Sequence, residues 1–77
     1  KIRGGKNVVV EDSGTVITFS PAYADTNYMR SYFYCWRVDE DGNIVDISCS
    51  FTIINSSSFR VVPAGDGFLD WQTTYLG

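Results

Sequence analysis

Turn residues divide this sequence into short apolar segments, and that division constrains its fold more than any other feature. No stretch has the period of an amphipathic helix, whereas β-branched and aromatic runs alternate with clusters of Gly, Pro, Asn, Asp and Ser. Such alternation is typical of antiparallel sandwiches and barrels. We therefore predict an all-β domain, a six-stranded antiparallel β-sandwich, with strands at residues 6–10, 15–20, 28–38, 44–54, 59–62 and 68–76.

The chain is short and rich in apolar side chains. We expect its 77 residues to form a single domain, residues 1–77. A core of this size buries only about 60% of the unfolded surface, so it is marginal by itself. Aromatic residues make up 16% of the sequence, more than one small core accommodates, so we expect the surplus at an interface. Because the sequence begins at Lys1 rather than Met, we expect a C-terminal fragment of a longer chain.

Charge and composition argue against several classes of function. The net charge is −3 and the six basic residues are scattered, so no basic patch favours nucleic acid. No apolar run approaches the roughly 20 residues needed for membrane insertion. The chain has no His, and so lacks the commonest general base and the Ser-His-Asp arrangement. We expect no enzymatic activity, no cofactor and no metal.

The predicted strand at residues 28–38 has aromatic side chains at alternate positions. Strict alternation places five residues on one face, namely Tyr28, Arg30, Tyr32, Tyr34 and Trp36. The opposite face is half apolar, so both faces are expected to be partly covered, one of them by a neighbouring protomer. Trp36 and its neighbours could form a platform on which sugars stack. The alternative is burial in the core or in a seam between protomers.

The two cysteines, Cys35 and Cys49, flank the strongest turn signal in the sequence. They can form a cross-strand disulfide if they face each other directly. A three-residue loop at 40–42 would instead pair Cys35 with Ile47, and Cys49 with Phe33. We expect two buried thiols that behave as small apolar side chains.

Acidic residues concentrate in the turns that share one end of the predicted sandwich. Antiparallel strands alternate in direction, so the loops at 11–13, 38–43 and 63–67 lie together, opposite both termini. We predict that this tip binds a cation, a cationic surface or sugar hydroxyls; the alternative is that turns simply favour Asp. The candidate ligand-binding residues are Asp12, Asp39, Asp41, Asn43, Asp66 and Trp36.

Three segments resemble one known family. Residues 15–27 read TVITFSPAYADTN and are followed by Tyr28, residues 51–61 read FTIINSSSFRV, and residues 71–77 read WQTTYLG. In order and spacing they are similar to the "VTFPxAFxDTNY", "strand, Asn, Ser/Thr-rich turn, Phe-x-Val" and "W-x-x-x-G" elements of bacteriophage tail-fibre C-terminal receptor-binding domains. That family has an H-type-lectin-like fold.

The resemblance implies a homotrimer that takes its ligand near the end of the trimer. It implies host-surface receptor binding, with a bacterial cell-surface glycan or protein as partner. The protein would be made in the bacterial cytoplasm and lie in the virion, at the tail-fibre tip. The alternatives are a structural trimerisation or capping module of a fibre that binds no ligand, and a carbohydrate-binding module appended to an enzyme.

Overall fold

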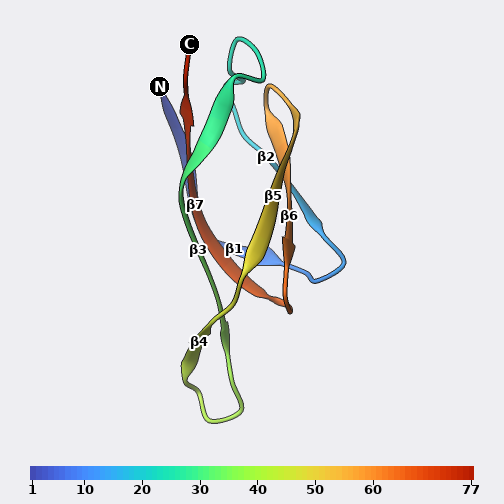
Figure 1. Cartoon of the computed structure of the whole chain (residues 1–77). Coiled ribbons are helices and arrows are strands. Elements are labelled where there is room, and N and C mark those ends of the chain that lie inside the picture. Colours follow the sequence, from blue (N-terminus) through green and yellow to red (C-terminus); the bar gives the residue numbers. More distant parts are fainter.

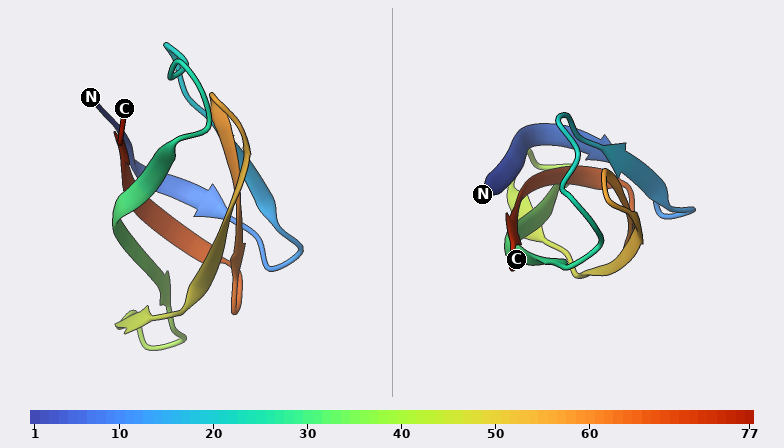
Figure 2. Two further views of the ribbon diagram at one scale, coloured as in Figure 1. Left: turned by 45° about the horizontal axis from the view of Figure 1, so that its top comes forward. Right: turned by 90° about the horizontal axis from the view of Figure 1, so that it is seen from above.

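The computed structural model describes all 77 residues and contains seven strands. The strands form two antiparallel sheets that face each other around a common core (Figures 1 and 2). The all-β prediction is confirmed, and no helix is present that could span a bilayer. The strands are β1 (Ile2–Val10), β2 (Thr15–Thr18), β3 (Tyr28–Val38), β4 (Ile44–Asp46), β5 (Cys49–Asn55), β6 (Ser58–Pro63) and β7 (Gly67–Tyr75).

Sheet A has the strand order β1-β7-β3-β4 and sheet B the order β2-β6-β5. The predicted strand at 44–54 is wrong as a single element, because it divides at Ile47 and Ser48 and gives seven strands rather than six. β4 pairs with β3 in sheet A, whereas β5 pairs with β6 in sheet B. The crossing keeps its backbone paired, since Ile47 N donates to Cys35 O (3.0 Å) and Ser48 O accepts from Ala64 N (2.8 Å). One apolar run thus joins the two sheets.

The core is a cluster of aromatic rings between the sheets. Phe59 is fully buried at its centre, with ring centroids at 5.0 Å from both Phe51 and Trp71. The accessible surface of 4619 Å² is close to the roughly 4,700 Å² expected for a folded monomer of this mass. Apolar side chains left outside the core therefore do not reflect a loose fold. The buried apolar residues are Val10, Ile17, Phe19, Tyr23, Tyr28, Cys35, Phe59, Val61, Leu69 and Trp71.

A bulge in β3 changes which of its side chains face the core. The register with β7 shifts between Arg30 and Tyr32, so Ser31 is an extra residue and the strict alternation predicted for this strand is wrong. Tyr28 lies in the core with 3% of its surface exposed, whereas Tyr32 is 52% exposed. From Tyr32 onward the even-numbered aromatic residues of β3 point away from the core.

Both cysteines are free thiols, Cys35 buried and Cys49 partly buried. The predicted pairing of Cys35 with Ile47 is confirmed. The predicted pairing of Cys49 with Phe33 is wrong, because the chain has crossed to sheet B and Cys49 pairs with Pro63. Burial, with a smaller effect of the neighbouring Cys49 thiol, raises the pKa of Cys35 to about 11 from its ordinary value of 9.0. The fold therefore favours the neutral thiol.

We expect the protein to lose stability in alkali. A folded-state pKa above the unfolded value favours the fold fully below about pH 9, and this contribution is lost as the pH rises towards 11. Burial raises the pKa of Cys49 and Tyr28 in the same direction. Urea unfolding at pH 7, 9 and 10.5 should show a falling midpoint, and Cys35→Ala should make the fall shallower. An equally steep fall in that variant would contradict the assignment.

The turns divide between the two ends of the molecule. Both termini lie beside the 21–27 loop and the β5–β6 turn, whereas the β3–β4 and β6–β7 turns lie at the opposite end (Figures 1 and 2). The termini are tied together by the hydrogen bond from Tyr75 N to Lys1 O (2.9 Å). The predicted grouping of these four turns is confirmed, and we call the end opposite the termini the distal end. The β1–β2 loop, predicted with the distal turns, lies at the side of the molecule in Figure 1 and is joined to the β6–β7 turn by the hydrogen bond from Asp12 N to Asp66 Oδ1.

Candidate functional site

The outer face of sheet A is an apolar surface that no part of the chain covers. Along β7, Leu69, Trp71 and Thr73 point into the core, so the alternate residues and their partners on β1 and β3 point outward. Ten large hydrophobic residues of the chain are exposed, and six of them lie on this face. These six are Ile2, Val9, Met29, Tyr32, Val38 and Ile44. Exposed apolar residues gathered on one face in this way are typical of an interaction surface.

The distal half of this face carries a ladder of stacked rings, which we call the aromatic ladder (Tyr34, Trp36 and Phe68). The ring of Trp36 lies 5.2 Å from that of Tyr34 and 5.8 Å from that of Phe68, with interplanar angles of 19° and 29°. The Tyr34 hydroxyl donates to Asp46 Oδ1 (2.9 Å), and this bond raises the pKa of Tyr34. Trp36, predicted to bind ligand, therefore lies outside the core and is half-buried by its neighbours.

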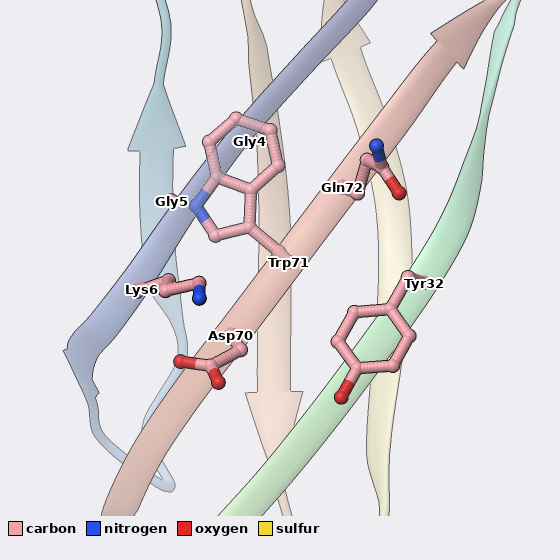
Figure 3. A pocket seen from close by; sticks show the side chains of 7 residues that line it. All are labelled: Gly4, Gly5, Lys6, Tyr32, Asp70, Trp71 and Gln72. Atoms are coloured by element: carbon pink, nitrogen blue, oxygen red, sulfur yellow. The ribbon is translucent and has the colours of Figure 1, made fainter.

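The half of the face nearer the termini contains a hollow of about 560 Å³. Tyr32 of β3 stands on one side, and β1 with the indole of Trp71 on the other, with β7 between them (Figure 3). We call this space the Gly4–Tyr32 hollow. Its lining residues are Gly4, Gly5, Lys6, Tyr32, Asp70, Trp71 and Gln72.

The floor of the hollow depends on the absence of a side chain at Gly5. Gly5 pairs with Trp71 across β1 and β7, and a Cβ at Gly5 would lie 2.5 Å from Trp71 Nε1. The indole packs edge-on against Phe59 in the core (5.0 Å, 71°). The Nε1 atom of Trp71 makes no hydrogen bond in the chain. Every fully buried polar side-chain atom of the protein has a hydrogen-bond partner, so this atom is not fully buried. The N–H is therefore not sealed from solvent, and Trp71 is one of the residues that line the hollow.

A second bulge fixes the polar wall of the hollow. The register of β1 shifts between Gly5 and Val8, and Asn7 has a φ of 55°. Asp70 Oδ1 accepts a hydrogen bond from Asn7 N (2.9 Å), which holds the carboxylate beside the bulge. The other carboxylate oxygen of Asp70 and the side-chain amide of Gln72 have no partner in the chain. Donors, acceptors and an aromatic ring thus converge on one space.

At the distal end, Asp39 structures the turn between β3 and β4. Its Oδ1 accepts hydrogen bonds from the backbone N–H groups of Asp41 and Asn43, both at 2.9 Å. Gly42 completes the turn with a φ of 82°, which favours glycine. Asp41 and Asn43 are exposed. Among the predicted ligand residues of this turn, Asp39 thus has a structural role, whereas the side chains of Asp41 and Asn43 face solvent.

The structure brings Asp12 and Asp66 together from different loops. Asp66 Oδ1 accepts a hydrogen bond from Asp12 N (2.9 Å), which ties the β1–β2 loop to the β6–β7 turn. A hollow of about 530 Å³ lies beside Asp66 and is also lined by Glu11, Arg37 and Val38. This hollow adjoins the turn that carries Asp39. No three acidic or cysteine side chains are grouped so that they could hold a metal ion.

The Gly4–Tyr32 hollow has no counterpart in the sequence predictions. Gly4 and Gly5 are poor strand formers, so the predicted first strand begins only at Lys6. Two features of the sequence could have indicated the hollow, the Gly4-Gly5 pair and the distant Trp71. A large indole can pack across a strand where the facing residue has no side chain. The structure unites these elements through the pairing of Gly5 with Trp71.

Comparison with known proteins identifies no relative. The chain matches no family model, no curated protein and no solved structure.

Proposed function

We propose that this chain is a non-enzymatic receptor-binding module that assembles as a homotrimer at the tip of a phage tail fibre. The distal half of the outer face of sheet A carries the assembly part of the proposal, because the aromatic ladder lies there together with three exposed hydrophobic residues, Val9, Val38 and Ile44. The resemblance of three sequence segments to tail-fibre C-terminal domains supports the place in the virion. The partner would be a bacterial cell-surface glycan or protein.

The aromatic ladder is the proposed seam between protomers. Rings of this kind dominate the energetics of interfaces because they bury a large area with little loss of side-chain entropy. The molecule measures 44 × 21 × 17 Å. Only the half of the long face that carries the ladder is the proposed contact, which leaves the half nearer the termini open to solvent. Trp71 does not contribute to this seam, because it is buried in its own core.

The acidic distal end is the proposed contact with the host surface. Asp41 and Asn43 are exposed there, and Asp12 and Asp66 lie together beside the distal hollow. Three copies around one axis would bring three such ends together, and multivalent contact raises the apparent affinity of weak sites. The structural roles of Asp39 and Asp66 in their turns favour the second candidate, a fibre cap that binds no ligand.

We expect the triple variant Asp39→Asn, Asp41→Asn and Asp66→Asn to weaken binding to host cells several-fold. The asparagine Oδ1 still accepts the turn hydrogen bonds, so the melting temperature should change little. The measurement is retention of labelled protein on bacterial cells. Asp25→Asn is the matched control, because Asp25 also accepts a turn hydrogen bond, from Asn27 N, in the 21–27 loop at the opposite end. Wild-type protein that binds no cells would favour the fibre-cap function.

A further inference from the structure

The Gly4–Tyr32 hollow combines an exposed aromatic ring with hydrogen-bonding groups that have no partner in the chain. Tyr32 presents a half-exposed ring, with 52% of its surface accessible and no hydrogen bond to its hydroxyl. Trp71 also lines the hollow, and its indole N–H is not sealed from solvent. Between them β7 supplies one free carboxylate oxygen of Asp70 and the free amide of Gln72. An apolar ring therefore stands beside two acceptor groups and two donor groups.

These groups match the chemistry of one ligand class. A pyranose has C–H faces that stack on aromatic rings and hydroxyls that both donate and accept hydrogen bonds. Asp70 and the Gln72 carbonyl can accept from hydroxyls, while the Gln72 amide and Trp71 Nε1 can donate. The single cation, Lys6, faces the single anion, Asp70, across the lining. The lining has no net positive charge that would attract a phosphate or a carboxylate. A neutral polyol needs no such charge.

We propose that the Gly4–Tyr32 hollow binds one neutral pyranose unit of a glycan. The ring of Tyr32 stacks on the sugar, and Asp70, Gln72 and the Trp71 N–H contact its hydroxyls. This proposal rests on the proposed function as a receptor-binding module and names a second contact, on the flank rather than at the distal end. The volume of about 560 Å³ is large enough for one sugar residue and open enough for a chain to continue.

The hollow adjoins the aromatic ladder, because Asp70 pairs with Tyr34 across β7 and β3, but it lies on the side of the ladder nearer the termini. It lies on the half of sheet A nearer the termini, whereas the aromatic ladder and the acidic turns lie distally. Asp70 is held by Asn7 N and Trp71 by the core, so two of the contacting groups are fixed before any ligand arrives. A preformed arrangement reduces the entropy lost on binding.

The test is a titration of the labelled wild-type protein with the methyl glycosides of glucose, galactose, mannose and N-acetylglucosamine, followed by NMR. The chain has two tryptophans, so Trp36 and Trp71 give two indole N–H signals. At least one glycoside should move the Trp71 indole and the Gly4 and Gly5 amides, with a dissociation constant on the order of 1 mM. The Trp36 indole should stay in place.

Two variants address the contacts directly. Tyr32→Ala and Gln72→Ala should each weaken the affinity for the responsive glycoside at least about fivefold. Both side chains make no hydrogen bonds in the fold, and Tyr32 is largely exposed, so the variants should fold normally. Thr52→Ala, an exposed strand position on sheet B, is the control and should bind as the wild type does.

Three results would overturn the hollow as a sugar site. The first is that none of the four glycosides shifts the NMR signal of the Trp71 indole. The second is that only the signal of the Trp36 indole shifts, and the third is that both variants bind the glycoside with the affinity of the wild type. Cell binding by wild-type protein in any of these cases would leave the receptor-binding function intact. Glycoside binding in the hollow without cell binding would support the sugar site and reject the tail-fibre function.

Discussion

Phe59→Ala should lower the free energy of unfolding by about 3–5 kcal/mol, the cost of removing a fully buried aromatic ring from a packed core. The ring of Phe59 contacts those of Phe19, Phe33, Phe51 and Trp71, with centroids between 5.0 and 6.4 Å away. A chain of 77 residues has a total stability of only about 4–12 kcal/mol. The variant should therefore be largely unfolded in urea concentrations that leave the wild type intact.

The measurement is urea unfolding followed by tryptophan fluorescence at one fixed protein concentration. Phe59→Leu serves as the control, because it keeps most of the apolar volume and should cost less than half as much. A Phe59→Ala midpoint within error of the wild type would mean that the cluster around Phe59 is not the stabilising core.

If the proposed trimer forms through the aromatic ladder, Trp36→Ala should shift the protein from trimer to monomer. Trp36 is the middle ring of the aromatic ladder and is stacked on both sides. Truncation of a central interface tryptophan costs about 2 kcal/mol or more at each seam. Because folding and assembly are coupled by mass action, the wild-type melting temperature should fall on dilution, whereas that of the variant should depend far less on concentration.

Sedimentation velocity and thermal melts across a hundredfold dilution series measure both effects. Val62→Ala is the matched control, since Val62 is an exposed apolar residue on the outer face of sheet B. The control should remain trimeric. A Trp36→Ala protein with the same assembly as the wild type would place the seam elsewhere on the surface.

The sequence correctly predicts most of the strands whose limits are set by a local pattern of apolar and turn residues. The third strand, 28–38, matches β3 at both ends, because apolar runs and flanking turn residues bound it. The crossing at Ile47 and Ser48 could not be predicted, since no Gly or Pro interrupts the run from Ile44 to Ile54. The division arises because the run pairs first with β3 and then with β6, and both partners are distant in sequence.

The site was predictable only where a single loop forms it. The turn at Asp39 can be predicted from its residue types. The Asp39 carboxylate accepts a hydrogen bond from the backbone of the turn, as is typical of Asp in this position. The outward direction of Tyr32 and Trp36 depends on the bulge at Ser31, which no turn residue marks. The Gly4–Tyr32 hollow requires three strands to meet, so neither composition nor periodicity indicates it.

The mass of the wild-type protein in solution tests the central claim most directly, namely that the distal half of the outer face of sheet A is an interface between protomers. Sedimentation equilibrium at micromolar concentration should give three times the 8.6 kDa mass of the chain. A mass of 8.6 kDa, with a melting temperature independent of dilution, would contradict both the seam and the proposed trimeric fibre tip.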